Sequence, residues 1–248
     1  AAAQTIRAEH PAADLAVIPL DLASLQSVRA CAASIASDYD QMHYLINNAG
    51  LMAPPKRQTT ADGFELQFGT NHLGHFALTG LLLDLILRTP GARVVNVSSI
   101  AHYMGKINFA DLNSERRYQP GLAYGQSKLA NLLFTYELQR RFAAAGAQAS
   151  VTAAHPGWSA TNLQAHMGPT AFISTIVGQS AQMGALPTLM AAVTPTAGGV
   201  YFGPGGFGAL RGYPKQTTSN ARSHDRAVAA RLWGVSEQLT GVRYAALD

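Results

Sequence analysis

Residues 94–138 read VVNVSSIAHYMGKINFADLNSERRYQPGLAYGQSKLANLLFTYEL, and they carry the clearest strand and helix patterns of the chain. A β-branched run at its start predicts a buried strand over residues 93–98, and apolar residues at helical spacing predict a long helix over residues 122–144. Strand and helix patterns also alternate before and after this stretch. Such alternation is typical of a parallel sheet covered by helices.

The flanking sequence supplies the other elements. Further strand patterns fall at residues 14–20, 42–46, 148–155 and 200–202. Further helix patterns fall at residues 1–9, 24–35, 65–88, 180–193 and 226–239. Asp62 and Glu65 resemble a capping box for the 65–88 helix, and the 226–239 helix has the pattern of a surface helix. We expect an α/β fold with a doubly wound parallel sheet, as one domain over residues 1–248.

Composition narrows the class of protein. Hydrophobic residues make up 48% and charged residues 13%, with a net charge of +4 and no dense basic run, which argues against disorder and nucleic-acid binding. The single cysteine, Cys31, excludes an internal disulfide, and metal-ligand spacings are absent. We recognise no signal peptide or membrane span. We therefore expect a cytoplasmic protein without a metal.

Tyr124 and Lys128 are the first candidates for chemistry. They stand four residues apart in a helix pattern, so they share one helix face. An ammonium beside a phenol is expected to lower the phenol pKa, so that the tyrosine can exchange a proton near neutral pH. Because such pairs also arise by chance, the pair alone is only a hypothesis.

Ser98 and Ser99 add a second candidate at the end of the 93–98 strand. Parallel strands bring side chains to a crevice at their carboxyl ends, where ligands bind in open α/β sheets. A hydroxyl there can hydrogen-bond an oxygen that gains charge. The alternative is that these serines merely end the strand.

Five motifs in one order now suggest a family. They are NNAG (47–50), NHLGHFALT (71–79), VVNVSS (94–99), YGQSK (124–128) and HPG (155–157). From about Asp14 onward, the chain resembles the short-chain dehydrogenase/reductase family, and it is most similar to the retinol dehydrogenase-like and protochlorophyllide reductase-like branch. The resemblance implies a Rossmann-type sheet and an NAD(P)-dependent oxidoreductase that interconverts a carbonyl and an alcohol, on a small lipophilic substrate.

The same resemblance implies roles for the motif residues. Tyr124 is expected to be the acid/base, Lys128 to hold the nicotinamide ribose as well, and Ser99, in preference to Ser98, to position the substrate oxygen. Asn71 is expected to interrupt its helix and hold a water. The cofactor, NADP in preference to NAD, is expected to contact Tyr124 and Lys128 together with Asp21, Leu22, Asn48, Ala49, Gly50, Pro156, Gly157, Trp158 and Thr161.

One part of the family pattern has no counterpart here. A dinucleotide pyrophosphate needs bare backbone N–H groups at a helix N-terminus, yet residues 1–11 contain no glycine. The glycine cluster at residues 203–208 contains a proline and is expected to be a loop. We expect the first βαβ portion to lie outside residues 1–248, or the strands to have rearranged. Residues 1–248 alone are then expected to bind the dinucleotide weakly.

The alternative function is a catalytically inactive, cofactor-binding or truncated family member.

Two further expectations concern the surface. Residues 163–195 are apolar but broken by glycine and proline, so they predict either a flexible cover over a lipophilic substrate or a plain core helix after residue 180. Leu132, Leu133, Tyr136 and residues 81–87 offer apolar surface that suggests a homodimer or homotetramer.

Overall fold

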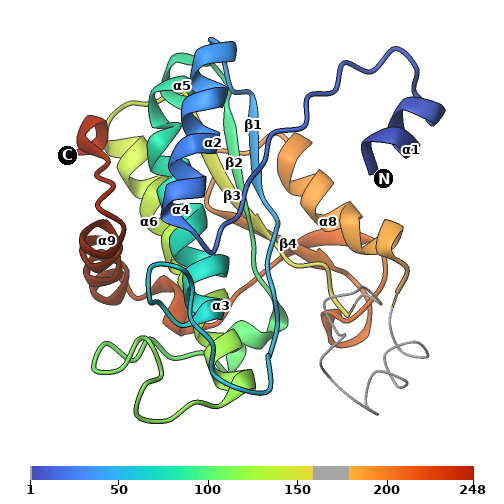
Figure 1. Cartoon of the computed structure of the whole chain (residues 1–248). Coiled ribbons are helices and arrows are strands. Elements are labelled where there is room, and N and C mark those ends of the chain that lie inside the picture. Colours follow the sequence, from blue (N-terminus) through green and yellow to red (C-terminus); the bar gives the residue numbers. More distant parts are fainter. Residues whose placement is uncertain (1, 159–178) are drawn as a thin grey trace.

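A single five-stranded sheet forms the centre of the computed structural model, which describes residues 2–158 and 179–248 (Figure 1). The strands follow one another across the sheet in chain order: β1 (Tyr44–Asn47), β2 (Arg93–Val97), β3 (Ser150–Ala154), β4 (Val200–Pro204) and β5 (Pro214–Thr217). The first four strands are parallel, and β5 pairs antiparallel with β4. The predicted parallel α/β sheet is confirmed. Gly203 and Pro204 belong to β4, so the loop predicted for residues 203–208 was wrong at its start.

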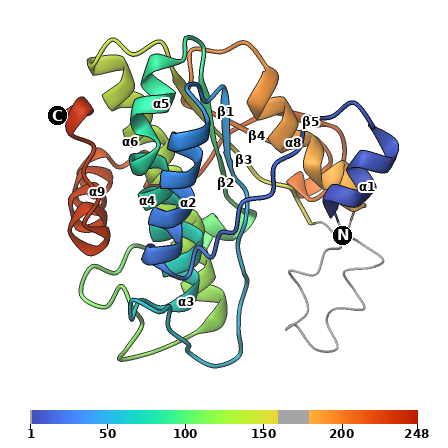
Figure 2. The same cartoon turned by 45° about the horizontal axis from the view of Figure 1, so that its top comes forward.

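Helices cover both faces of this sheet, as the two views in Figures 1 and 2 agree. On one face lie α2 (Leu25–Asp38), α4 (Gly74–Leu81), α5 (Leu83–Arg88) and α6 (Pro120–Ala144), with α9 (Arg226–Thr240) outside α4 and α6. On the other face lies α8 (Ala181–Val193), and the short α1 (Ala2–Glu9) stands near it. None of the helices in the described ranges combines the length and apolar character needed to cross a membrane.

The strand predicted at residues 14–20 does not form. This segment runs as irregular chain, with Val17 74% and Leu20 40% exposed. In a doubly wound sheet it would pair with a strand located between it and β1, and the described residues supply no such strand. β1 is therefore an edge strand. Its side chains alternate between the two faces of the sheet, and Tyr44 and Ile46, on the face opposite α2 and α4, remain exposed.

The helix predicted from residue 65 to residue 88 is divided into several segments. Glu65 is the N-cap of α3 (Leu66–Phe68), a π-helical turn follows at Gly69–Leu73, and α4 continues from there. The predicted capping box was wrong because Asp62 caps a different helix: its Oδ2 accepts the N–H of Leu25 at the start of α2, 2.9 Å away. Sequence neighbours alone could not reveal this partner, which is 37 residues away.

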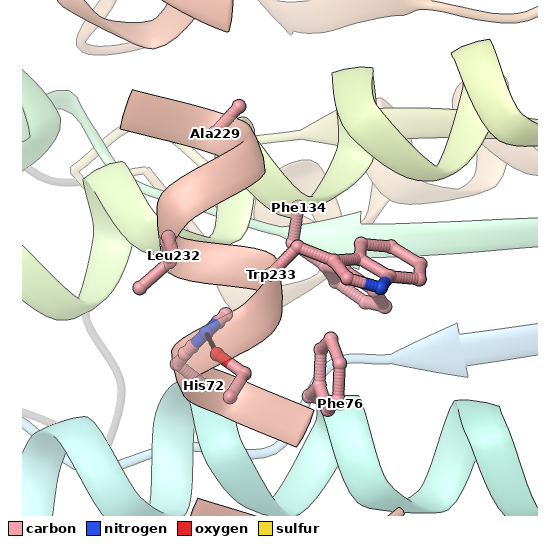
Figure 3. A pocket seen from close by; sticks show the side chains of 7 residues that line it. His72, Phe76, Phe134, Ala229, Leu232 and Trp233 are labelled. Carbon is pink, nitrogen blue, oxygen red and sulfur yellow. Dashed lines mark hydrogen bonds between the residues drawn. The ribbon is translucent and has the colours of Figure 1, made fainter. Parts of the chain in front are cut away.

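The apolar faces of α4 and α6 are covered within the chain. Leu132 and Leu133 are fully buried, and Tyr136 and most of residues 81–87 are buried too. Trp233 of α9 packs on Phe76 and Phe134, around a cavity of about 10 Å³ (Figure 3). α9 is thus the surface helix that its sequence predicts, with one side packed on α4 and α6 and the other exposed. The surface proposed for an oligomer is largely occupied by the chain itself.

α8 forms where a helix was expected after residue 180, and it packs on the sheet with one side. Its buried residues include Pro187, Ala191 and Ala192, and the Thr152 hydroxyl of β3 donates to the Ala191 carbonyl at 2.9 Å. Leu189 and Val193 on its other side are exposed. Residues 163–178 lie outside the described ranges, so a substrate cover there stays a prediction.

Candidate active site

The carboxyl ends of β1, β2 and β3 meet at one edge of the sheet because the three strands are parallel and in register. Five candidate residues lie at or just after the ends of these strands: Asn47 and Gly50 at β1, Ser98 and Ser99 at β2, and His155 at β3. α6 packs on β2 and β3 and carries Tyr124 and Lys128. The sheet and one helix thus bring together the groups that the sequence placed in separate motifs.

Tyr124 and Lys128 share the inner face of α6, as predicted. Both side chains are buried, with 6% and 4% exposed, and Lys128 Nζ lies 5.6 Å from the centroid of the Tyr124 ring. Nζ donates to the Val97 carbonyl at the end of β2, 3.3 Å away. Val97 O is the acceptor that the described structure gives this ammonium, so it has N–H groups to offer to a ligand.

Burial controls the protonation of this pair. It raises the pKa of Tyr124 to about 12, and a contact with the Ser99 hydroxyl only partly offsets the rise. Burial also lowers the pKa of Lys128 to about 8. The net shift of the phenol pKa is therefore upward, opposite to the expected direction, because the cost of burying a phenolate is the largest effect in this structure. At neutral pH both groups carry their protons.

The hydroxyls of Ser98 and Ser99 contact different groups. Ser98 is 1% exposed, and its hydroxyl donates to the Lys128 carbonyl of α6 at 2.8 Å. Ser99 caps a short helical turn, accepting the Ala101 N–H at 3.2 Å, and its hydroxyl contacts the Tyr124 phenol. Ser98 therefore joins β2 to α6, whereas Ser99 stands beside the candidate acid.

Asn71 lies in the π-helical turn, so the predicted interruption of its helix is confirmed. Its amide holds the Leu51 backbone on both sides, accepting the N–H at 2.9 Å and donating to the carbonyl at 3.0 Å. It also donates to the Ser127 hydroxyl of α6 at 3.0 Å. Asn71 thus connects the chain after β1 to the helix of Tyr124. The expectation that Asn71 also holds a water stays a prediction.

Gly50 shows how closely the backbone approaches this centre. A Cβ at Gly50 would lie 2.8 Å from Asn71 Oδ1 and 3.5 Å from Lys128 Nζ. Asn48 and Ala49, just before it, are exposed at the same edge. A bare backbone and an ammonium with spare donors fit the ribose and nicotinamide half of a dinucleotide. No glycine-rich helix N-terminus that could cradle the pyrophosphate precedes β1 in the described part of the chain.

Of the remaining residues predicted to bind the cofactor, some lie at the same edge of the sheet as Tyr124 and others do not. Pro156, Gly157 and Trp158 follow β3 at the same edge, and the Trp158 N–H donates to the Leu210 carbonyl at 2.7 Å. Leu22 is buried against Gly74, and Asp21 holds its own turn by accepting the Ala23 N–H. The structure therefore connects neither of these two to the Tyr124 centre, and Thr161 lies outside the described residues.

Two residues near the site were not singled out from the sequence. Ser127 holds Asn71, and it could have been found because it stands one helical turn after Tyr124. Tyr201 of β4 is buried between the rings of His102 and His155, with its hydroxyl close to Ser98. Its pairing partners are far away in sequence, so no local signal marked it. The described residues contain no cluster of three potential metal ligands.

Comparisons with known proteins agree with this geometry. The family model for short chain dehydrogenase matches residues 1–171. Human retinol dehydrogenase 12 is 41% identical, across 98% of this chain and 75% of that protein. Human retinol dehydrogenase 13 is 42% identical, across 98% and 73%.

Solved structures give the same result. A crystal structure of an uncharacterised protein from Mycobacterium paratuberculosis is 45% identical with a TM-score of 0.78, covering 97% of this chain and 81% of that one. An NADPH-bound carbonyl reductase from chicken fatty liver shares the fold, with a TM-score of 0.58 at 21% identity over 81% of this chain and 78% of that one. The chain belongs to the short chain dehydrogenases, a family of NAD(P)-dependent oxidoreductases, and within it to the branch that contains the retinol dehydrogenases.

Proposed function

We propose that this protein reduces a lipophilic carbonyl compound to an alcohol with NADPH, and that Tyr124 donates the proton. One observation carries this proposal: the buried Tyr124 phenol shares a helix face with Lys128 and contacts the Ser99 hydroxyl. Burial raises the pKa of this phenol, which keeps its proton in place before the reaction, as a proton donor requires.

Four residues of the site have separate roles in the proposed reaction. A bound nicotinamide supplies the hydride. Tyr124 gives its proton to the carbonyl oxygen, and Ser99, whose hydroxyl contacts that phenol, donates a hydrogen bond to the same oxygen. Lys128 holds the nicotinamide ribose, and its positive charge stabilises the phenolate that Tyr124 becomes. Asn71 keeps the Gly50–Leu51 backbone against this centre.

The names of the relatives and the apolar composition near the site support a lipophilic substrate class. Human retinol dehydrogenases 12 and 13, at 41% and 42% identity, are named for a long apolar alcohol. In this chain, the apolar residues Leu51 and Met52 directly follow Gly50 at the site. We therefore propose a retinoid or a medium-chain aliphatic aldehyde as substrate. The preference for NADPH over NADH rests on the branch alone.

A coenzyme and substrate matrix tests this proposal. The purified protein is assayed with NADPH and NADH against retinaldehyde, nonanal and, as a small polar control, glyceraldehyde. We expect turnover of the two lipophilic aldehydes, with kcat/KM for NADPH at least roughly tenfold above that for NADH, which corresponds to about 1.4 kcal/mol. Cofactor binding without reduction of any carbonyl would contradict the proposal and favour a cofactor-binding protein.

A further inference from the structure

Side chains from distant parts of the chain bind several backbone groups of the loop at residues 50–54. Besides the two bonds from Asn71 to Leu51, the Ala53 N–H donates to Gln67 Oε1 at 2.7 Å. The Tyr118 hydroxyl donates to the Pro54 carbonyl, also at 2.7 Å. The loop is therefore fixed from outside.

Gln67 is the centre of this arrangement. It is fully buried, and its Nε2 lies within hydrogen-bond distance of the Tyr118 hydroxyl at 3.3 Å and the Pro120 carbonyl at 3.2 Å. Pro120 is the first residue of α6, four residues before Tyr124. One amide side chain thus joins the 50–54 loop to the beginning of the helix that carries the candidate acid.

Gln67 is itself held in place. Glu65, also fully buried, accepts the backbone N–H of Gln67 at 3.0 Å and that of Phe68 at 2.8 Å. These bonds tie the Gln67 backbone to the start of α3. The Gln67 amide, which binds the 50–54 loop, is therefore attached to a capped helix end.

Ala53 shows that the loop needs such an anchor. Its φ of 51° lies in the left-handed region, which is strained for a residue with a Cβ. A conformation of this kind persists only where the surroundings impose it. The bonds from Gln67 to Ala53 and from Tyr118 to Pro54 flank the strained peptide.

The position of the loop gives the arrangement a function. The loop begins at Gly50, in contact with Asn71 and Lys128, and continues with Leu51 and Met52. We propose that Gln67, with Tyr118, is a positioning residue: it sets the distance between the 50–54 loop and Tyr124, and so shapes the apolar wall against which the carbonyl substrate rests. This inference rests on the proposed carbonyl reduction. The proton transfer itself uses none of these groups.

Gln67→Met tests the inference, because methionine fills the same volume without the amide. The matched control is Gln126→Met. Gln126 is also buried, accepting the Asn108 N–H at 2.9 Å and donating to the Leu112 carbonyl at 3.0 Å, and so holds a different loop. We expect Gln67→Met to raise KM for the aldehyde roughly tenfold, with kcat and the Kd for NADPH within about threefold. Gln126→Met is expected to leave KM unchanged.

Tyr118→Phe and the double variant extend the test. Because Gln67 and Tyr118 contact each other and hold the same loop, their effects on KM are expected to be less than multiplicative. Equal changes in KM for Gln67→Met and Gln126→Met, or an unchanged KM in Gln67→Met, would overturn the inference.

Amide exchange separates this inference from the proposed function. In Gln67→Met, the Leu51 amide is expected to exchange faster, although its own bond goes to Asn71, because the whole loop loosens. Unchanged exchange at Leu51 would overturn the inference even if the protein reduces no aldehyde. Faster exchange without any aldehyde reduction in the wild type would overturn only the proposed function.

Discussion

Adjacent serines at the end of β2 act in different directions because successive side chains of an extended chain point to opposite sides. Ser98 bonds to the α6 backbone, and Ser99 contacts the Tyr124 phenol. The sequence favoured Ser99 only through a family resemblance. The structure supports the same choice by geometry, since the Ser98 hydroxyl already has an acceptor.

Single alanine substitutions distinguish the two serines. Ser99→Ala is expected to lower kcat about 100-fold, because the oxygen that gains charge loses a hydrogen-bond donor. Ser98→Ala is expected to leave kcat within about threefold and to lower the free energy of unfolding by about 1 kcal/mol. Steady-state kinetics and urea unfolding of both variants measure this. A larger loss of kcat in Ser98→Ala would reverse the assignment.

Tyr124 and Lys128 illustrate what sequence spacing can and cannot predict. The shared helix face of Tyr124 and Lys128 follows from their spacing, and it is confirmed. The direction of the Tyr124 pKa does not follow from spacing, because it depends on burial by β2, β3 and the chain after them. An i and i+4 pair predicts proximity, but the protonation state is a property of the folded site.

At the scale of elements, the site depends on a close approach between α6 and the turn after β2. A Cβ on Gly125 would lie 2.8 Å from the Ala101 carbonyl, and one on Gly105 would lie 2.3 Å from the Gly125 carbonyl. Both glycines therefore let the backbone of α6 touch the segment that begins at Ser99. This contact fixes the distance from Ser99 to Tyr124.

Gly125→Ala is expected to lower kcat at least tenfold, because the added methyl pushes α6 away from Ser99. Gly121→Ala on the same helix is the control, since nothing lies within 4 Å of its added Cβ. The control is expected to keep its activity and to gain roughly 0.5–1 kcal/mol of stability from better helix propensity. Equal activity in the two alanine variants would show that the contact does not position the site.

Local sequence patterns predicted most helices and strands but not the contacts between segments that are distant in the sequence. The helices at α2, α6 and α8 and the strands β1 to β4 follow from periodicity. The cap of α2 by Asp62 and the antiparallel β5 depend on contacts distant in sequence, and no local signal encodes them. The π-helical turn at Asn71 was expected only from the family resemblance.

At the scale of the whole molecule, the predicted strand at residues 14–20 shows the limit of periodicity. The pattern gives a segment that could be a strand, but a strand needs a neighbour to accept its backbone hydrogen bonds. α9 shows the converse. Its sequence has a polar face, yet its apolar side is buried on α4 and α6, which removes the argument that those helices await a partner subunit.

Three buried histidines predict acid sensitivity for the whole fold. Burial lowers the pKa of His72 to about 3, and those of His75 and His155 to about 4. As pH falls below about 6.5, the unfolded chain takes up protons that the folded chain cannot accept, so stability decreases towards pH 4. His72, whose Nε2 contacts Ser236 at 3.0 Å, contributes from inside the core (Figure 3).

Urea unfolding at pH 7.5 and pH 5 measures this. We expect the free energy of unfolding to decrease by roughly 3 kcal/mol or more, at up to about 1.4 kcal/mol per pH unit for each histidine. His72→Gln is expected to reduce the number of protons that the chain takes up on unfolding at pH 5 by about one, and so to weaken this pH dependence. Equal stability at the two pH values would contradict the buried, neutral state of these rings.

Tyr124→Phe tests whether the buried phenol of Tyr124 is the proton donor. The substitution keeps the ring and removes the hydroxyl that carries the transferable proton. We predict that, with saturating NADPH, kcat for aldehyde reduction falls about a thousandfold or more, while the Kd for NADPH measured by titration stays within about threefold. A Tyr124→Phe protein that reduces the aldehyde at the wild-type rate would contradict the account and require another acid.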